Sequence, residues 1–447
     1  MGEQLTEGVA ATRPPVVSQR RAARRSGAGP ALLRIAAYLA AVVGVAHLFL
    51  LSPRIPDAVA PATCVSNVQV SEGLNFTFTC DSPAFLLLAE DPGAIFDDPP
   101  TWQSRPGIFV TAYLLNPLLS PLRAVLGQDR YGIDDPRHIT YVFINLVLLV
   151  LVLVAFERLL RGGRVPWLGV LLLAPLLLFN DVVKAFFWTP HTPILGMLTP
   201  LVSVLCCAWV LRTRAAAWWH LGLLGLGLGL LSLAYGLVLG VAIAVGLAVL
   251  RAWWQRRPRS LLRLGSDLAG FIAAFALPQL AWIAVVQAKT GGYYSHEVEF
   301  YRQVVWITDT LGEGLGTFLD QLTRHQASFG QATWPVLVLP LLLVAVIGAF
   351  WATTPGRAAS VLAVDRTLAA ASALTLAGFG VFLALLGFYQ QRLSWTLVPP
   401  VLVLGALLLK DGAGAATPRR RAAMYGVVGA LVLAMCVWTQ VKAGPWS

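Results

Sequence analysis

The sequence predicts an all-α polytopic membrane protein with about eleven transmembrane helices and a large first extracytoplasmic loop that carries interfacial helices. Two features of composition predict this class. The first is the balance of residue types, since 57% of the 447 residues are hydrophobic and only 12% are charged. The second is the mean hydropathy of +0.70. The third observation is the pattern, because apolar runs of about twenty residues, enough to cross about 30 Å of hydrocarbon, alternate with short basic blocks. A soluble globular domain is excluded.

The first 31 residues are polar and arginine-rich, and we interpret residues 1–31 as a disordered basic cytoplasmic tail. The remainder, residues 32–447, reads as a single transmembrane catalytic domain. The tail's paired arginines resemble a twin-arginine signal, but its length favours an uncleaved anchor. The apolar segments lie at 33–52, 139–156, 166–180, 191–211, 217–233, 236–252, 265–287, 335–352, 367–388, 393–409 and 422–440. Because one helix over 217–252 would be too long for a bilayer, a turn is expected at Tyr235-Gly236.

The charge distribution sets the orientation. With the amino terminus inside, the inner connections carry about twice as many basic residues as the outer ones, and most carboxylates lie outside. The net charge of +11 therefore reflects membrane orientation, and no nucleic-acid partner is expected. We expect a multi-pass protein of the plasma (inner) membrane with two large extracytoplasmic loops, 53–138 and 288–334.

The segment 107–126 is apolar but contains Asn116, Pro117, Pro121 and Arg123. A transmembrane span here would invert every later segment and place the basic loops outside, against the charge rule. We therefore expect 107–126 to form interfacial or re-entrant helices at the outer leaflet.

Cys64 and Cys80 both lie in the first outer loop, where an oxidising environment predicts a disulfide between them. The sequences VSNVQV and LNFTFT between them alternate like two strands around Glu72-Gly73, which predicts a small β-ribbon.

The stretch CDSPAFLLLAEDPGAIFDDPPTWQSRPG, residues 80–107, gathers carboxylates around a single arginine. Asp81-Ser82-Pro83 is a helix start, which on its own makes Asp81 a capping residue. The helix should end at Glu90-Asp91-Pro92-Gly93. The secondary acidic candidates in this loop are Glu90, Asp91, Asp97 and Asp98, of which the last two could also be a solvated turn. Arg105 could act on a ligand or reach toward lipid headgroups.

This arrangement resembles the GT-C superfamily of membrane glycosyltransferases, which take sugars from polyprenyl-phosphate donors. Asp81 is similar to the essential acidic residue of the first outer loop in that superfamily. Arg105-Pro106-Gly107 is similar to its downstream basic-Pro-Pro motif, with Gly in place of the second Pro. The resemblance implies that Asp81 is the general base of an inverting sugar transfer to a glycan, glycolipid or protein acceptor.

The leaving phosphate needs cations at the membrane surface. The candidates that bind the donor phosphate are Arg105, Lys184, His191 and Arg392. Each of these residues could instead have a local structural role. In the second loop the aromatic residues, Tyr293, Tyr294, Phe300, Tyr301 and Trp306, could stack on a sugar, although an interfacial belt is the simpler interpretation. No metal signature and no cofactor motif is present, and the resemblance leaves open a divalent ion held by Asp81 with Asp97 or Asp98.

Three other functions fit the same composition. A transporter or flippase of a lipid-linked saccharide should show paired repeats, and none is evident in the sequence. An O-antigen-ligase-like glycan ligase or polymerase would depend on basic residues in a late loop, and 288–334 holds few. A non-enzymatic assembly subunit is the third alternative. The sequence contains no nucleotide-binding fingerprint, which argues against a nucleotide-sugar donor.

Overall fold

The computed structural model describes residues 28–55, 65–97, 102–126, 137–191, 193–213, 218–255, 260–353, 365–387 and 391–442. Within these residues nine helical segments are long and apolar enough to cross a membrane. Seven of them are α2 (Ala28–Leu50), α5 (His138–Gly162), α9 (Leu195–Arg212), α11 (Val238–Gln255), α12 (Leu261–Thr290), α17 (Arg366–Leu386) and α20 (Pro418–Val441). The other two are α15 (Leu315–Ala352) and the span Gln391–Gly414, which combines α18 (Gln391–Ser394), η4 (Trp395–Leu397) and α19 (Val398–Ala415). The predicted class of an all-α polytopic membrane protein is confirmed.

The two remaining predicted spans, 166–180 and 217–233, fall on shorter apolar helices. The first is divided into α6 (Trp167–Leu173) and α7 (Pro175–Leu178), and the second is α10 (Trp218–Ser232). Helices of this length cross a full bilayer only with help from their neighbours. A total of eleven spans therefore stays a prediction.

The helix α10 packs on α12 through glycines. A Cβ at Gly225 would lie 2.5 Å from the carbonyl oxygen of Phe271, and a Cβ at Gly229 would lie 2.3 Å from that of Phe275. Only glycine allows the two backbones to approach this closely, as in the small-xxx-small contacts of membrane helices. The turn after α10, which contains the predicted Tyr235-Gly236, lies against the start of α4 (Pro106–Leu126), where the Gly107 amide donates to the Leu233 carbonyl.

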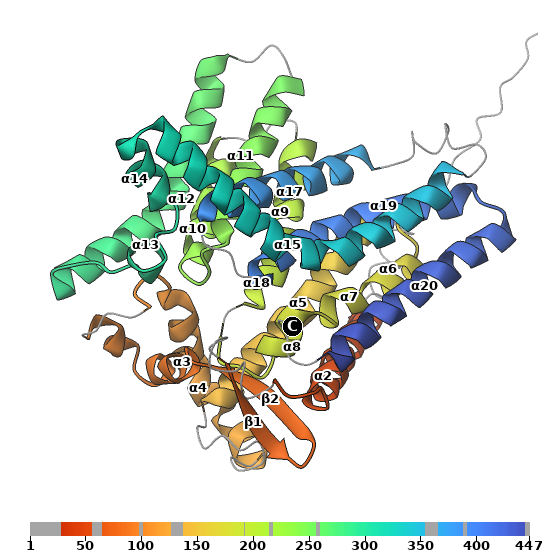
Figure 1. Ribbon diagram of the computed structural model, residues 1–447, viewed down its shortest axis with the longest axis horizontal. Helices are drawn as coiled ribbons and strands as arrows, with labels where there is room; N and C mark the ends of the chain where they lie inside the picture. Colours follow the sequence, from red (N-terminus) through yellow and green to blue (C-terminus); the bar gives the residue numbers. More distant parts are fainter. Residues whose placement is uncertain are drawn as a thin grey trace, which may run out of the picture.

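The first of the two large loops, 53–138, contains the predicted β-ribbon, which is confirmed. Strand β1 (Val65–Ser71) pairs antiparallel with β2 (Leu74–Thr79), and Gly73 in the turn has a φ of +77°. The ribbon is joined to the membrane domain by Thr77, whose Oγ1 donates a 2.8 Å hydrogen bond to the Ala185 carbonyl. Figure 1 shows the ribbon together with α3 and α4 at one end of the molecule. Cys64 lies outside the described residues, so its bridge to Cys80 stays a prediction.

After the ribbon the chain forms α3 (Ser82–Glu90), η2 (Pro92–Phe96) and α4 (Pro106–Leu126). The helix α3 begins and ends where the sequence predicted. The predicted interfacial segment 107–126 is the helix α4, which packs against α3 and α5 and is not among the nine spanning segments found in the described residues. Its position relative to the bilayer stays a prediction.

The second large loop, 288–334, is more helical than we expected. It contains α13 (His296–Glu299) and α14 (Val305–Glu313), and α15 begins at Leu315, well before the predicted start of its span at residue 335. The polar residues before 335 do not interrupt a helix, and Asp320 and Arg324 form an i,i+4 ion pair at 2.7 Å. At 1.5 Å per residue the 38 residues of α15 measure about 57 Å, so the helix extends beyond the hydrocarbon layer.

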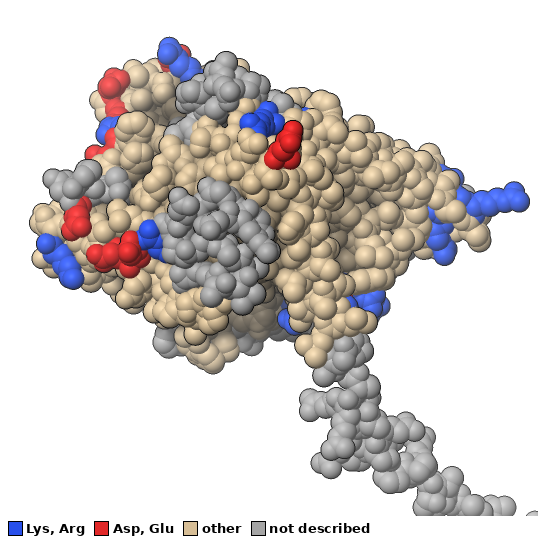
Figure 2. Space-filling view, turned by 90° about the horizontal axis from the view of Figure 1, so that it is seen from below, with Lys and Arg blue, Asp and Glu red and all other residues tan. Residues whose placement is uncertain are grey.

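Between α7 and α9 lies the short helix α8 (Asp181–Phe186), which begins with a cap in which Asn180 Oδ1 accepts from the Val183 amide. All six residues of α8 are buried, and they place Lys184 and Phe186 among the surrounding helices. On the face drawn in Figure 2, carboxylates gather toward the left, and the right-hand end shows Lys and Arg without Asp or Glu. Lys and Arg also lie beside the carboxylates on the left, so the right-hand end differs only in showing basic residues alone.

Candidate functional site

A cavity of about 560 Å³ lies between the two large loops and the ends of α10, α11 and α17. Asp81, Arg105, His191 and Arg392 all line it. These residues come from four separate parts of the chain: the turn before α3, the turn before α4, the connection from α8 to α9, and α18. The structure therefore brings together four of the five residues to which the sequence gave a catalytic or phosphate-binding role. A cavity of this size suits a small-molecule ligand.

Asp81 occupies the cap position of α3, but its side chain makes no capping hydrogen bond. Ser82 Oγ instead accepts from the Thr79 amide at 3.2 Å and stabilises the turn. The Asp81 carboxylate points toward His191, and its Oδ2 lies 3.2 Å from His191 Nε2. Asp81 is therefore held by a partner from another part of the chain rather than by its own helix.

His191 is buried, with 3% of its side chain exposed. Its ring stacks on Phe85 with centroids 4.8 Å apart and lies 5.2 Å from the ring of Phe186. Burial lowers the pKa of His191 to about 4, although the hydrogen bond with Asp81 opposes this change. His191 is thus neutral at pH 7, and we assign its proton to Nε2 because the carboxylate of Asp81 can only accept.

Asp81 is ionised at neutral pH. Partial burial opposes the charge, but the hydrogen bond from His191 and the positive charge of Arg392 outweigh it, so the pKa of Asp81 lies below its ordinary value. In the part of the chain that the structure describes, His191 is the one hydrogen-bond donor to this side chain. One carboxylate oxygen is left to accept a proton from a ligand in the cavity.

A second carboxylate in the cavity, that of Glu297, was not among the site residues proposed from the sequence. Its Oε1 lies 2.5 Å from Arg105 Nη2, and its Oε2 accepts from Ser104 Oγ at 2.8 Å and from Ser295 Oγ at 3.3 Å. Burial opposes ionisation, but Arg105 and these donors hold the pKa of Glu297 below its ordinary value. A salt bridge between two loops almost two hundred residues apart has no local sequence signal.

The same two loops are also joined through Gln103. Its carbonyl accepts from Trp282 Nε1 at 2.6 Å, and its side-chain oxygen accepts from the Tyr294 amide at 3.0 Å. Gln103 is buried, and its amide nitrogen donates to the Ile95 carbonyl. These bonds fix the segment that carries Arg105 against the wall of the cavity.

Arg392 also lines the cavity, within electrostatic range of Asp81, Arg105 and Tyr235. Its guanidinium carbon is 5.6 Å from the centroid of the Phe186 ring, a cation–π contact. Among the described residues no carboxylate is paired with it, whereas Arg105 is paired with Glu297. Arg392 is therefore the cation of the cavity that remains available to an anionic ligand.

The rest of the lining combines aliphatic side chains with aromatic and polar ones. It includes Trp102, Tyr235, Gln279, Tyr293, His296 and Tyr301. Burial raises the pKa of Tyr235, so its hydroxyl stays protonated. The sequence favoured an interfacial belt for the aromatic residues of the second loop, but Tyr293 and Tyr301 face the cavity, and Trp306 packs against Gly387. Aromatic faces beside amide and hydroxyl groups suit a ligand with both apolar and hydrogen-bonding surfaces.

Gly107, the departure from the basic-Pro-Pro pattern, has a structural reason. Its amide donates a 3.0 Å hydrogen bond to the Leu233 carbonyl, and a Cβ here would lie 3.1 Å from the Ala234 nitrogen. Proline would lose that hydrogen bond and crowd the turn after α10. Glycine therefore lets the segment carrying Arg105 pack directly on the turn that carries Tyr235.

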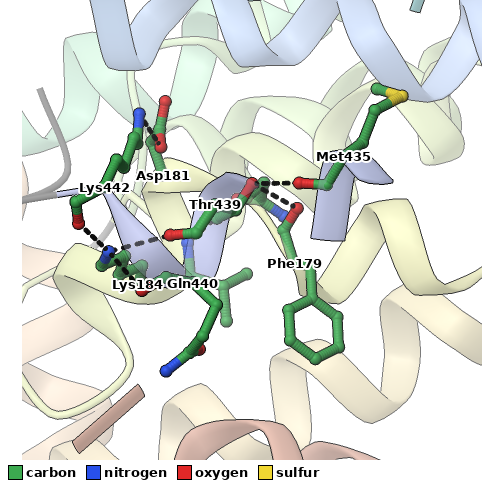
Figure 3. A network of polar contacts seen from close by, with 9 residues as sticks. Phe179, Asp181, Lys184, Met435, Thr439, Gln440 and Lys442 are labelled. Carbon is green, nitrogen blue, oxygen red and sulfur yellow. Dashed lines mark hydrogen bonds and ion pairs between the residues drawn. The ribbon is translucent and has the colours of Figure 1, made fainter. Parts of the chain in front are cut away.

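The remaining candidates lie outside the cavity. Lys184 Nζ donates to the carbonyls of Thr439 and Lys442 at 2.8 Å each, at the end of α20 (Figure 3). Lys184 is close to His191 in the sequence, but it lies outside the cavity. The helix α8 turns Lys184 toward α20 and Phe186 toward His191.

The acidic candidates of the first loop have local roles. Glu90 forms an ion pair with Arg137, and Asp91 accepts from the Gly93 amide at the start of η2. Asp97 is exposed at the end of η2, and Asp98 lies outside the described residues. Within the described residues no group of three His, Cys, Asp or Glu side chains is placed to hold a metal ion.

A scan against protein-family models finds no match for this sequence, and a search of curated proteins finds none either. The fold and the site together define a polytopic helical membrane protein with a charged cavity beside its extramembrane loops.

Proposed function

We propose that this protein is a membrane glycosyltransferase that transfers a sugar from a polyprenyl-phosphate donor to an extracytoplasmic acceptor with inversion. The observation that carries the proposal is one cavity that is lined by the ionised carboxylate of Asp81 and by the guanidinium groups of Arg105 and Arg392. Sugar transfer from a phosphate needs a base for the acceptor hydroxyl and cations for the leaving group, and these are the groups that line the cavity.

Asp81 is the better base of the two carboxylates. Glu297 already accepts from Arg105, Ser104 and Ser295, so its lone pairs are largely occupied. Asp81 accepts from His191 alone among the described residues. A neutral His191 orients the carboxylate without supplying a full charge, which keeps Asp81 available to accept the proton of an acceptor hydroxyl.

The cations complete the arrangement. As the anomeric bond breaks, negative charge grows on the departing phosphate, and nearby guanidinium groups stabilise it. We expect Arg392 to bind the donor phosphate first, because Arg105 is already paired with Glu297. A single displacement, with Asp81 on the acceptor side of the sugar and the cations on the phosphate side, inverts the anomeric centre.

The proposal is tested with the full-length protein in liposomes and labelled polyprenyl-phosphate donors carrying hexosyl or pentosyl groups, with an extract of envelope glycans as acceptor. Asp81→Asn keeps the shape and can still accept a hydrogen bond from His191, but it is not a base. We expect donor binding to be retained and transfer to fall about 10²–10⁴-fold.

The matched control is Asp97→Asn, which changes an exposed carboxylate of the same loop outside the cavity and should leave transfer unchanged. Transfer by Asp81→Asn at the rate of the unmodified protein would refute the role of Asp81. Movement of intact saccharide lipid between leaflets without cleavage of the phosphate–sugar bond would identify a flippase instead.

A further inference from the structure

Three ring side chains line the cavity that contains Asp81 without a part in the proposed proton and phosphate chemistry: Trp102, His296 and Tyr301. We call them the ring cluster. The Trp102 ring contacts the rings of His191 and His296, with centroids 6.4 Å and 6.3 Å away, and His296 contacts Tyr301 at 4.9 Å. His296 and Tyr301 both lie within electrostatic range of the Asp81 carboxylate. The ring cluster is therefore a neighbour of the proposed base.

The backbone that carries these rings has an uncommon conformation. In the described part of the chain four residues other than glycine have a positive φ, and three of them are Trp102, Arg302 and Val304, at +62°, +51° and +63°. This conformation is costly for residues with a side chain, above all for a β-branched valine, and it persists only where the surrounding structure holds it. Here the buried Gln103 anchors the first segment, and the Val304 amide donates a 3.1 Å hydrogen bond to the Leu386 carbonyl. Costly backbone conformations of this kind cluster at ligand sites.

The ring cluster also has polar groups that can meet a ligand. His296 Nδ1 lies 3.1 Å from the Tyr294 hydroxyl, and His296 Nε2 has no hydrogen-bond partner among the described residues. The indole N–H of Trp102 has none within that part of the chain either, and both side chains are partly exposed. Burial, and then the negative charge of Asp81, raise the pKa of Tyr301, so its hydroxyl stays protonated. The cluster therefore combines apolar ring faces with N–H and O–H groups.

This combination suits a sugar ring. The C–H face of a sugar packs on an aromatic ring, while its hydroxyls need hydrogen-bonding groups at the edge of that ring. A peptide acceptor would instead need partners for its backbone N–H and C=O groups, such as the edge of a sheet. The β-ribbon of β1 and β2, which is the one sheet in the described residues, contributes no residue to the lining of the cavity. The lining beside Asp81 therefore favours a carbohydrate over an extended peptide.

We propose that Trp102, His296 and Tyr301 form the acceptor subsite, and that the acceptor is a carbohydrate. This inference rests on the proposed sugar transfer and assigns its second substrate. The acceptor hydroxyl must touch the base, so a sugar on the ring cluster presents one hydroxyl to Asp81. The oxygen of that hydroxyl bonds to the anomeric carbon as the bond from this carbon to the phosphate oxygen breaks. The hydroxyl proton passes to Asp81, and the phosphate leaves with the electron pair of the broken bond.

The first test measures acceptor binding in the absence of donor. Saturation-transfer NMR of the purified full-length protein uses methyl glycosides of hexoses and pentoses as probes, with a peptide that contains serine and threonine for comparison. We expect the protein to bind a glycoside and not the peptide. Trp102→Leu should weaken glycoside binding about tenfold or more, and Trp102→Phe should restore part of it. Trp334→Leu is the matched control, because Trp334 is an exposed tryptophan of α15 that lies outside the cavity.

The transfer assay then separates the two substrates. His296→Phe keeps the ring that stacks on Phe300 but has no ring nitrogen, so it should raise the KM for the glycoside about tenfold and change the KM for the labelled donor less than about twofold. A rise in the donor KM instead would overturn the acceptor assignment. Transfer to the peptide and not to glycosides would overturn the carbohydrate class and leave the proposed transfer standing. Glycoside binding that depends on Trp102, without transfer to any acceptor, would support the subsite and refute the proposed function.

Discussion

Replacing His191 with phenylalanine separates its role as a positioning residue from a role as the base itself. Phenylalanine can keep the stacking contact with Phe85 and the fit beside Phe186, but it cannot donate to Asp81. The Asp81 carboxylate then loses its one side-chain donor in the described part of the chain. Because that hydrogen bond favours the charged form, its loss raises the pKa of Asp81.

The size of the effect follows from the exposure of the pair. A hydrogen bond to a charged group is worth about 1.5–3 kcal/mol, and one pKa unit corresponds to about 1.4 kcal/mol. The Asp81 side chain is 33% exposed, so water replaces part of the lost bond and the lower end of the range applies. We expect the acid limb of the pH–rate profile to move upward by about one pH unit. Transfer at pH 7 should fall less than about tenfold, since Asp81 remains ionised there.

The assay is the rate of sugar transfer as a function of pH for His191→Phe and the unmodified protein. In the unmodified protein the rate should be level from about pH 8 to about pH 5, because the pKa of Asp81 lies below its ordinary value and its carboxylate loses activity only when protonated. His325→Phe, outside the cavity, is the control and should leave the profile unchanged. Complete loss of transfer by His191→Phe at every pH, in a folded protein, would mean that His191 is itself the base.

Three other predictions concern a single side chain, a single glycine and the pair Cys64 and Cys80. Arg392→Gln should raise the KM for the polyprenyl-phosphate donor about tenfold or more with a smaller change in kcat, as measured by donor titration, and Arg392→Lys should restore part of the affinity. Gly229→Val should lower the melting temperature of the purified protein, because its side chain has no room against the Phe275 carbonyl, whereas Gly227→Val has open space and should not. Mass spectrometry of unreduced peptides should find Cys64 linked to Cys80, and two freely alkylated thiols would exclude the bridge.

The sequence predicted the helices well because their signal is local. The length of an apolar run indicates a membrane helix, and Pro83, two residues after Asp81, indicates the start of α3. The β-ribbon could likewise be predicted from alternation around Gly73. The early start of α15 could not, because the polar residues before Pro335 are compatible with a loop and with a helix outside the bilayer.

The candidate site was predictable where a charge lies in a short loop between apolar runs, since such charges are costly and seldom incidental. That argument found His191 and Arg392, but it also selected Lys184. The ammonium of Lys184 instead donates to backbone carbonyls at the end of α20. This contact depends on the orientation of α8 in the fold, which the local sequence does not show. Asp81 and Arg105 were selected from the motif of the first large loop and its resemblance to a known superfamily. Glu297 was missed because its ion pair with Arg105 joins two distant loops, and the sequence around Glu297 does not indicate that contact.

The charges of the cavity give a reason why the proposed reaction would use both Arg105 and Arg392. Asp81 and Arg392 carry opposite charges without touching as an ion pair, whereas Arg105 and Glu297 form a close one. A donor phosphodiester adds one negative charge, which Arg392 can balance. Cleavage of the anomeric bond adds a second charge to the leaving phosphate while Asp81 takes up a proton and becomes neutral. Arg392 then has no carboxylate to balance, and Arg105 can share its donors between Glu297 and the phosphate. The proposed reaction therefore moves negative charge from Asp81 to the phosphate without changing the total charge of the cavity, so the partly buried site gains no additional uncompensated ion.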